Sequence, residues 1–523
     1  MPSGNPSSAT PSAVSASLAK DRLGVFSVIM FAMTAAAPLL VVSGLVVSGW
    51  AGFGIVGLPL AFVVLGLVLA VFSAGYVAMA RHITNAGAFY SYIAHGTNKT
   101  LGVGASLIAL LAYNMLQVGI YGFFGVIGSG LLADKLHWDV SWWVVALVGW
   151  LLIAIMGALR VDINSKIIGV LLAIEIVFVL IYDVVALGHP DGGSVSVAAF
   201  EPKNLFVAGV GAAFALVITA FTGFEAAPVF AEEAKHARKT IPAATYLALA
   251  VMGILYALTS WALTVTIGPG NVAGAAQKDP NFLFFSTAAR LFSSGTADLA
   301  LLLLFTSLFA AAVSFHNSVA RYSFALGREG VLPRVLGTTN ARTGAPLVAS
   351  IIQTVVGLVV IVVYAIAGWD PTQKLFFWLG TTGGFGILIL LIGTSIAAII
   401  YFGRDSRGES IWSRLIAPVL AAVALGYVFY QTVKAFPNLL VVASDAPIAW
   451  ILPGLYAAMF VIGVLWALYL RSSRPEVYNA IGLGAKAVTG LIPAANGLLR
   501  VAERASARRI EREVIPASRA TAV

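Results

Sequence analysis

Runs of about twenty apolar residues recur along the whole chain and are separated by short polar segments. A helix of that length crosses the ~30 Å hydrocarbon core of a bilayer. Because that core holds no water, each run must pair its own backbone groups, which favours helices over an open sheet. We therefore expect an all-α polytopic membrane protein of about twelve helices. The expected ranges are 24–49, 54–80, 103–133, 141–159, 165–187, 207–232, 242–267, 297–325, 346–368, 375–402, 412–434 and 448–470.

Composition excludes an ordinary soluble enzyme. Hydrophobic residues make up 60% of the 523 residues and charged residues only 10%, whereas soluble domains carry about 25% charged residues. The chain has no cysteine. This excludes disulfide frameworks, thiolate metal sites and cysteine nucleophiles.

The formal net charge of +9 comes from basic residues that fall in alternate loops. If the N-terminus is cytoplasmic, 25 of the 31 Lys and Arg residues lie on the cytoplasmic side. This is the positive-inside bias, which predicts an even number of helices and cytoplasmic N- and C-termini. We interpret the charge as a signal of topology in the cytoplasmic membrane, and we expect no nucleic-acid partner.

The two ends of the chain are polar. Residues 1–20 are rich in Ser, Ala and Pro; they lack the apolar stretch of a signal peptide, and we expect a disordered cytoplasmic tail. Residues 471–523 are basic and alternate with apolar positions. They predict either an amphipathic helix on the anionic lipids of the inner leaflet or a solvated tail. Residues 21–470 are expected to form one transmembrane domain.

A short motif occurs twice, five helices apart. Residues 34–40 read TAAAPLL in the first expected helix, and residues 224–230 read FEAAPVF in the sixth. The odd offset gives the two copies opposite orientations in the membrane. Paired helix breaks in two halves of a chain indicate the binding site of a transporter.

Proline explains why each motif should break its helix. It lacks an N–H and clashes with the carbonyl four residues earlier, so Pro38 should free the carbonyl of Thr34 and Pro228 that of Phe224. Gly223 weakens the sixth helix further, and each proline can begin a second half-helix. Freed carbonyls suit an ammonium group, and half-helix N-termini suit a carboxylate. Kinks that serve only packing are the alternative.

Three longer stretches carry a resemblance. Residues 220–244 read AFTGFEAAPVFAEEAKHARKTIPAA, residues 85–102 read NAGAFYSYIAHGTNKTLG, and residues 316–337 read HNSVARYSFALGREGVLPRVLG. In this order they resemble the amino acid–polyamine–organocation (APC) superfamily of permeases, and in particular its bacterial amino acid permease branch.

The resemblance implies a LeuT-like fold with a five-plus-five inverted repeat, formed by 24–187 and 207–402, and two additional helices in 412–470. It also implies alternating access and secondary active transport of amino acids or related amines, with proton coupling expected. Consistent with transport without ATP, the chain has no G-x-x-x-x-G-K-[ST] loop, and no cofactor is expected.

The first motif departs from the family pattern. Many members carry Gly-Ser-Gly at this break and bind the substrate carboxylate with its amides, but here the sequence reads Ala37-Pro38-Leu39. Pro38 has no amide to offer. A polyamine or amine importer, and an amino acid exchanger without ion coupling, therefore stay open as alternatives.

Two acids lie at membrane depth, where a charge costs several kcal/mol. Glu225 in the sixth helix is expected to stabilise the break, to attract a cationic substrate or to carry a proton. Glu175 lies in the middle of the fifth helix, near the place where some proton-coupled relatives have a lysine. Glu175 is a candidate to carry the coupling proton or to help form a cation site; a hydrogen bond to a Ser or Thr of a neighbouring helix is the alternative.

Polar and aromatic side chains near the breaks complete the candidate site. Tyr113 and Gln117 share a helix face and either line the substrate path or join helices. Phe221 and Phe224 are candidate covers over the substrate, and the small residues 380–384 suit a gate or a close helix contact. The predicted substrate-binding residues are Thr34, Ala37, Pro38, Tyr113, Gln117, Phe221, Thr222, Gly223 and Phe224, and the predicted ion-coupling residues are Glu175 and Glu225.

Other classes of membrane protein fit less well. An intramembrane enzyme needs a cluster such as His-Glu-x-x-His or paired aspartates, and neither is present, so no catalytic residue is expected. A channel does not require paired broken helices, and a major-facilitator transporter has parallel halves. A metal-ion transporter needs more ligands at the breaks than Glu225, and no metal site is expected. The sequence leaves open which amine or amino acid is carried.

Overall fold

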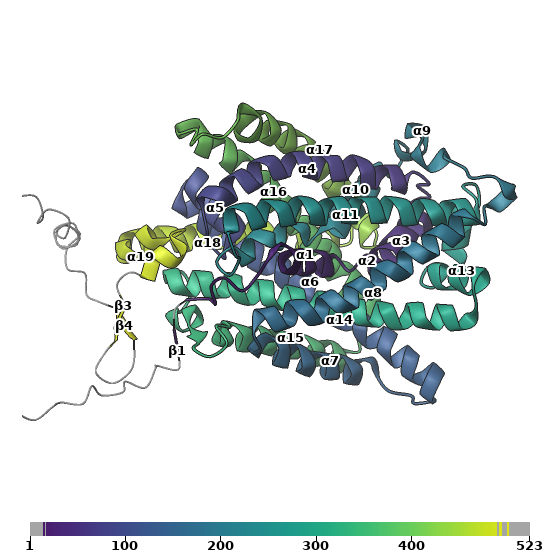
Figure 1. Ribbon diagram of the computed structural model, residues 1–523, viewed down its shortest axis with the longest axis horizontal. Coiled ribbons are helices and arrows are strands. Elements are labelled where there is room, and N and C mark those ends of the chain that lie inside the picture. Colours follow the sequence, from purple (N-terminus) through teal and green to yellow (C-terminus); the bar gives the residue numbers. More distant parts are fainter. Residues whose placement is uncertain (1–13, 16, 489–490, 494–498, 502–523) are drawn as a thin grey trace, which may run out of the picture.

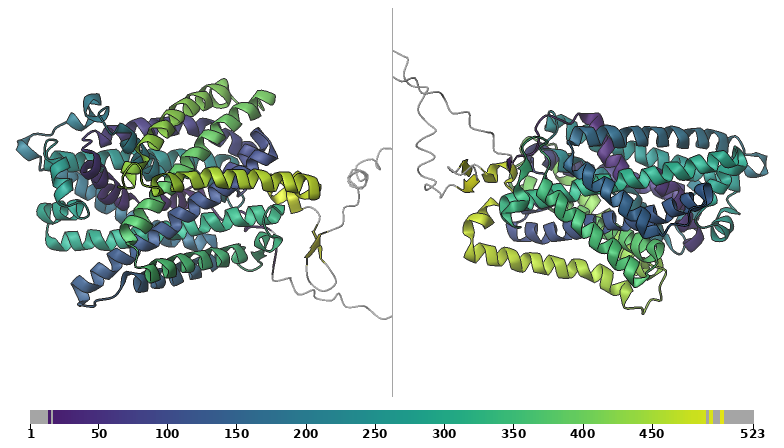
Figure 2. Two further views of the ribbon diagram at one scale, coloured as in Figure 1. Left: turned by 180° about the vertical axis from the view of Figure 1, so that it is seen from behind. Right: turned by 90° about the horizontal axis from the view of Figure 1, so that it is seen from below.

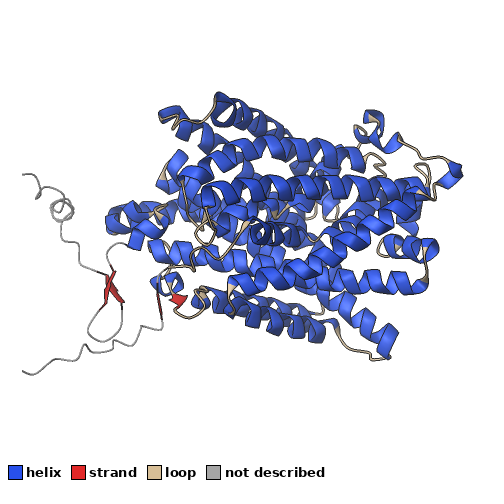
Figure 3. Ribbon diagram, in the orientation of Figure 1, coloured by secondary structure: helices blue, strands red, loops and turns tan. Residues whose placement is uncertain are grey.

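Long apolar helices make up most of the structure (Figure 3). The computed structural model describes residues 14–15, 17–488, 491–493 and 499–501 of the chain. Within this part, eleven helical segments are long and apolar enough to cross a membrane, and one shorter apolar helix, Trp142–Ala158, has 17 residues. The prediction of an all-α protein with about twelve membrane helices is confirmed.

The helices and strands follow in the order α1 (Val25–Ala36), α2 (Pro38–Leu40), the π-helix η1 (Val41–Leu45), α3 (Val46–Phe53), α4 (Leu58–His82), α5 (Ala88–Gly96), α6 (Lys99–Leu136), α7 (Trp142–Ala158), α8 (Val161–Leu187), the 3₁₀-helices η2 (Asp191–Gly193) and η3 (Ala198–Phe200), α9 (Pro202–Leu205), α10 (Val210–Phe221), the 3₁₀-helix η4 (Phe224–Phe230), α11 (Ala237–Ile267), α12 (Val272–Lys278), α13 (Leu283–Leu291), α14 (Ser294–Glu329), the 3₁₀-helix η5 (Arg334–Gly337), α15 (Leu347–Ala367), the π-helix η6 (Pro371–Phe377), α16 (Trp378–Arg404), the π-helix η7 (Trp412–Ile416), α17 (Ala417–Leu439), α18 (Ile448–Ser473), α19 (Pro475–Ala480) and the 3₁₀-helix η8 (Gly484–Val488); the strands are β1 (Val14–Ser15), β2 (Thr339–Asn340), β3 (Leu491–Pro493) and β4 (Leu499–Val501).

The helices lie roughly side by side, which gives the bundle two ends (Figure 1). One end carries α9 and α13, and the other carries α5 and α19. Following the predicted topology, we call the first the outer end and the second the inner end. Short helices such as α5 and α13 were not expected, because nine residues cannot cross a bilayer.

Two broken helices pack against each other inside the bundle. The first is α1, α2, η1 and α3 in succession, and the second is α10 followed by η4. The helices α4, α6, α8, α11 and α14 surround them, and α16 packs on α6. The two additional helices lie at the periphery, where α17 packs on α4, α10 and α16, and α18 runs along α6 (Figure 2). This arrangement is the expected inverted-repeat fold.

The ends of the described chain contact the inner end. Strand β1 pairs antiparallel with β2, Val14 opposite Asn340. After α19, the amides of Gly482 and Gly484 donate to the buried carboxylate of Glu329, each at 2.8 Å. The tails predicted for 1–20 and 471–523 fall partly outside the described residues, namely at 1–13, 16, 489–490, 494–498 and 502–523.

Candidate functional site

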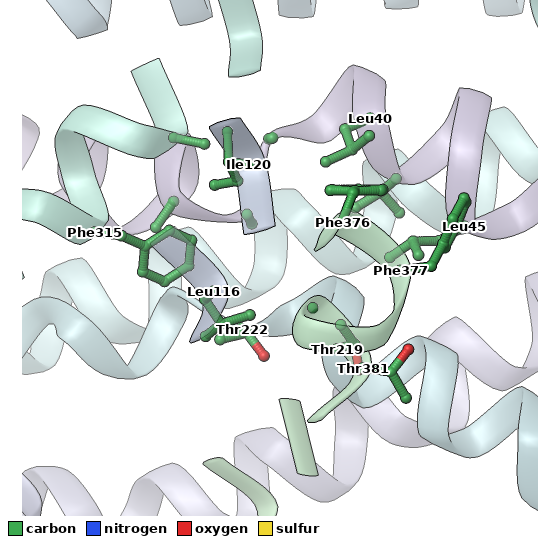
Figure 4. Close-up of a pocket in the computed structure, with 16 residues that line it drawn as sticks. Leu40, Leu45, Leu116, Ile120, Thr219, Thr222, Phe315, Phe376, Phe377 and Thr381 are labelled. Carbon is green, nitrogen blue, oxygen red and sulfur yellow. The ribbon is translucent and has the colours of Figure 1, made fainter. Parts of the chain in front are cut away.

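A cavity of about 60 Å³ lies between the two broken helices (Figure 4). It has room for roughly four water molecules. Its lining comes from both breaks and from α6, α14, η6 and α16, and it contains no charged side chain. The polar side chains in it are three threonines. The lining residues are Ala35, Ala36, Ala37, Leu40, Val41, Leu45, Leu116, Ile120, Thr219, Thr222, Ala311, Phe315, Phe376, Phe377, Gly380 and Thr381.

A larger cavity of about 1130 Å³ lies on the outer side of this one. Its lining includes Gln277 and Asn281 beside α12 and α13, and Asp370 before η6. Phe377 and Thr381 line both cavities, so these two side chains lie between them. The outer cavity is therefore a vestibule that leads towards the central cavity.

The break in the first helix occurs at Ala37, which adopts a left-handed conformation with φ of 47°. Its amide turns back and donates to the carbonyl of Thr34 at 3.1 Å. The expectation that Pro38 leaves the Thr34 carbonyl free is therefore wrong. Pro38 does begin the second half-helix, α2, as expected.

Glu175 of α8 caps the start of α2. Its Oε1 atom accepts the amide of Leu39 at 2.5 Å and the hydroxyl of Ser307 at 3.0 Å. The side chain is buried and is not part of the cavity lining. The Leu39 amide, which follows Pro38, therefore already donates its hydrogen bond to a carboxylate of the protein itself. The half-helix N-terminus was expected to offer this amide to the carboxylate of a ligand.

Glu225 holds the second break. Its Oε2 atom accepts the amide of Gly223 at 2.8 Å, and its Oε1 atom accepts the hydroxyl of Tyr113 at 3.0 Å. Tyr76 donates to the Glu225 carbonyl at 2.7 Å. Both carboxylate oxygens are therefore engaged in the break, as expected of a residue that stabilises it.

The second break lies at Thr222 and Gly223, upstream of Pro228. Pro228 sits inside η4, so the expectation that it begins a half-helix is wrong. Gly223 has φ of 127°, a conformation that a side chain disfavours. A Cβ atom at this position would lie 2.7 Å from the carbonyl oxygen of Ala32 and 2.8 Å from Cβ of Ala35. Glycine is required where the two broken helices touch.

Of the predicted substrate-binding residues, Ala37 and Thr222 line the cavity. The hydroxyl of Thr34 bonds to the Met30 carbonyl and lies 2.6 Å from the hydroxyl of Ser314. The remaining predicted residues, Pro38, Tyr113, Gln117, Phe221, Gly223 and Phe224, are buried around the breaks but are not in the lining.

The two predicted aromatic covers point elsewhere. Phe221 packs against Phe62 with ring centroids 6.1 Å apart, and Phe224 packs against Phe72 at 6.2 Å. Both partners belong to α4. Gln117 lies in a buried polar network, where it accepts from Gln353 at 2.6 Å. It therefore joins helices in this structure.

Most of the aromatic and small residues that line the cavity were not predicted from the sequence. Phe315, Phe376 and Phe377 carry no sequence signal, because the chain has 30 phenylalanines. The stretch 380–384 did give a signal, and its first two residues, Gly380 and Thr381, line the cavity.

Ion pairs close the inner end below the cavity. Arg321 donates to both carboxylate oxygens of Glu233, at 2.5 and 3.0 Å, and both side chains are buried. Arg328 pairs with Glu232 at 2.6 Å. Burial raises the pKa of Glu233, while the guanidinium of Arg321 opposes that rise. The backbone of Leu23 also donates to the Glu233 carbonyl, which ties the start of α1 to this gate.

Metal ligands are scarce in the described part of the chain. It contains no group of three or more His, Asp or Glu residues that could hold a metal ion. The arrangement is instead that of a central uncharged cavity, separated from an outer vestibule by Phe377 and Thr381, with ion pairs at the inner end.

Comparison with known proteins gives one family. A family model described as amino acid permease matches residues 23–464. The chain is 27% identical over 316 residues to the branched-chain amino acid permease BcaP of Bacillus subtilis, covering 56% of this chain and 64% of that protein. It is 24% identical over 379 residues to the low-affinity putrescine importer PlaP of Escherichia coli, covering 69% of this chain and 78% of that protein.

Among solved structures, a manganese transporter of Eremococcus coleocola shares the fold. The TM-score is 0.53 at 12% sequence identity, and the superposition covers 84% of this chain and 94% of that one. At this identity the likeness extends to the fold alone.

Proposed function

Because the chain belongs to the amino acid permease family, we propose that it carries a small neutral amino acid across the cytoplasmic membrane by alternating access. The substrate binds in the cavity between the two helix breaks. The observation that carries this proposal is the lining of that cavity, which is apolar apart from three threonines and has no charge. Such a lining suits an aliphatic side chain.

The amino group of the substrate has a site at the helix ends. Helix α1 ends at Ala36 and α10 ends at Phe221, and residues next to both ends line the cavity. The C-terminal end of a helix carries partial negative charge, which favours a cation. Two such ends that meet at one cavity support an ammonium site without a carboxylate.

The carboxylate of the substrate is assigned to hydroxyl groups. The Leu39 amide is bonded to Glu175, and Pro38 has no amide. The polar side chains that remain in the lining are Thr219, Thr222 and Thr381. We therefore place the carboxylate near these threonines.

A diamine such as putrescine is the alternative, since one relative is named as its importer. A diamine needs a counter-charge for each of its two ammonium groups. Glu175 and Glu225 are the nearest buried acids to the breaks, but both bond to backbone amides and to hydroxyls outside the lining. The uncharged cavity therefore favours the amino acid over the diamine.

We further propose an orientation for the chain in the membrane and a proton as the ion that moves with the substrate. The charge distribution supports cytoplasmic N- and C-termini, which makes the vestibule external. We propose that a proton moves with the substrate and that Glu175 binds it. Its contact with Leu39 supports this role, because the start of α2 would sense any change in the charge of the carboxyl group.

The test is uptake into liposomes that contain the purified full-length protein, with an imposed pH gradient, acidic outside. Labelled alanine, valine, leucine, lysine and putrescine are offered separately. We expect uptake of neutral amino acids above that of empty vesicles. Uptake of putrescine alone would favour the diamine alternative, and uptake of none of these compounds would reject the proposal.

Gly380 offers a probe of the cavity itself. A Cβ atom added there has no other atom within 4 Å, although the residue lines the cavity. We expect Gly380→Val to occupy the substrate space and to raise the KM for leucine by roughly 10- to 200-fold, the range for a mismatch of a methylene or so in a pocket. The KM for alanine should rise less. Competition uptake measures both values.

Gly403 is the matched control, because it lies on the same helix, is exposed and also has open space around an added Cβ atom. Gly403→Val should leave both KM values unchanged. An equal loss for leucine and alanine in Gly380→Val would contradict a substrate contact at this residue.

A further inference from the structure

A second acid lies on the same helix as Glu175 and was not singled out in the sequence. Asp183 of α8 follows eight residues later, and its side chain is 1% exposed. Eight residues correspond to about 12 Å along a helix. At 3.6 residues per turn the two positions are about 80° apart around the helix. Glu175 therefore faces α2 and α14, and Asp183, nearer the vestibule end, faces α11.

Asp183 is incompletely paired. Its Oδ2 atom accepts the hydroxyl of Thr259 on α11 at 2.9 Å. Its Oδ1 atom is buried and has no hydrogen-bond partner among the described residues. Buried polar atoms without a partner are uncommon in native proteins and call for a specific explanation.

A second unpartnered group lies between the two acids. The hydroxyl of Tyr256 is buried and likewise has no partner in the described part of the chain. Tyr256 precedes Thr259 by three residues on α11, so the two share a helix face. Its phenol is also close enough to Glu175 to interact with it electrostatically. The ring of Tyr256 packs against Phe62 and Phe221, with ring centroids 5.4 and 5.9 Å apart. Along the direction of the helices, Tyr256 therefore falls between the level of Thr259, which Asp183 contacts, and that of Glu175.

A contact between helices does not by itself need a carboxyl group here. An asparagine would accept from Thr259 equally well, whereas an unpaired buried carboxylate costs several kcal/mol. What a carboxyl group adds is the ability to bind and release a proton. We propose that Asp183 is the outer relay group through which a proton reaches Glu175. This inference rests on the proposed proton-coupled function.

The transfer changes no bond between heavy atoms. The carboxylate of Asp183 takes a proton from external water and becomes neutral. It then releases a proton towards Tyr256, whose oxygen accepts it while the proton of the Tyr256 hydroxyl passes to the Glu175 carboxylate. Neither of these two hydrogen bonds is formed in this structure, so the transfer requires the side chains to move or water to enter. Asp183 is left ionised, Tyr256 is unchanged, and one proton has moved to Glu175.

Charged and titratable groups are few at the outer end of α8. Arg290 of α13 lies near Tyr182, the neighbour of Asp183 in the chain, and its guanidinium donates to the Thr266 carbonyl at 3.0 Å. The titratable group that faces Asp183 is Tyr182 on α8; the further charged and titratable groups on the elements packed around this end are Glu175 on α8, Tyr256 on α11, Arg290 on α13 and His189 just after α8.

The test compares Asp183→Asn with the unmutated protein in liposomes, using the neutral amino acid that the unmutated protein takes up best. Uptake driven by the pH gradient is measured as a function of external pH, and exchange is measured at equal pH on both sides. We expect Asp183→Asn to slow gradient-driven uptake by about tenfold or more, since a positioned proton donor contributes at least that much. Exchange should fall far less, because it needs no net proton movement.

Asp183→Glu is the companion variant, because it keeps a titratable carboxyl group. It should recover much of the gradient-driven rate and shift the external-pH profile. Equal loss of uptake and exchange in Asp183→Asn would indicate a structural contact and overturn the inference, as would full gradient-driven uptake. Failure of the unmutated protein to transport any offered compound would instead reject the proposed function, so the two failures are distinguishable.

Discussion

Replacement of Glu175 by glutamine is expected to abolish accumulation of substrate while exchange across the membrane continues. A gradient of two pH units is worth about 2.7 kcal/mol per proton, enough for up to about 100-fold accumulation of a neutral substrate. Glutamine keeps an oxygen that can accept from Leu39 and Ser307, as Glu175 does. It cannot bind a proton, so the ratio of inside to outside concentration should fall to about one. Uptake with and without the gradient measures this ratio.

The variant Glu225→Gln tests whether the two acids differ in role, with Glu175 carrying the proton and Glu225 holding the second break together. The Glu225 carboxylate accepts from two donors, Gly223 and Tyr113, and an amide group presents one oxygen where the carboxylate presents two. We expect this variant to lose exchange and accumulation together. Accumulation that survives in Glu175→Gln would assign the coupling site elsewhere.

Replacement of Arg321 by glutamine is expected to open the inner end. The change leaves Glu233 buried without its cation, and breaking a buried ion pair in this way costs about 3–5 kcal/mol. This free-energy cost destabilises the conformation seen in this structure, in which the ion pair of Arg321 and Glu233 closes the inner end. The population should therefore shift towards an inward-open state by more than about a hundredfold.

The absence of cysteine makes this shift measurable. Ser318 is buried one turn of α14 above Arg321, and Ser318→Cys introduces a single thiol that a soluble reagent reaches only when the inner end opens. Labelling should be faster with Arg321→Gln and unchanged with Arg342→Gln, an exposed arginine at the same end. Equal labelling rates in all three proteins would show that the ion pair does not hold the gate.

The sequence predicts the helices and the region of the breaks, because both depend on local properties. Apolar length sets the helices, and the paired prolines mark the two irregular segments. The identity of each break residue is a different matter. The chain turns at Ala37 and Gly223, which both have positive φ angles. The second break falls at Gly223, where the two broken helices approach closely, and Pro228 lies further along, inside η4.

The lining of the cavity could not be predicted in the same way. A break rotates the residues that follow it, so helical periodicity no longer tells which side faces inward. Phe224, after the break, points to α4. Phe221 also packs on α4, whereas Thr219 faces the cavity, because residues two apart on α10 point in nearly opposite directions; the sequence does not tell which of these two directions is inward. Asp183 was missed because a single acid near the end of a helix resembles a polar boundary residue.

The winding of η4 sets the distance between the substrate and the inner gate. Its seven residues form a 3₁₀-helix, which at about 2.0 Å per residue extends about 14 Å. The same residues in an α-helix would extend about 10.5 Å, at 1.5 Å per residue. A change of winding alone would therefore draw Glu232 and Glu233, which follow η4 after Ala231, about 3.5 Å towards the membrane centre. That stroke exceeds the length of either ion pair, so a local change of pitch beside the substrate suffices to unlatch the far end of the transporter.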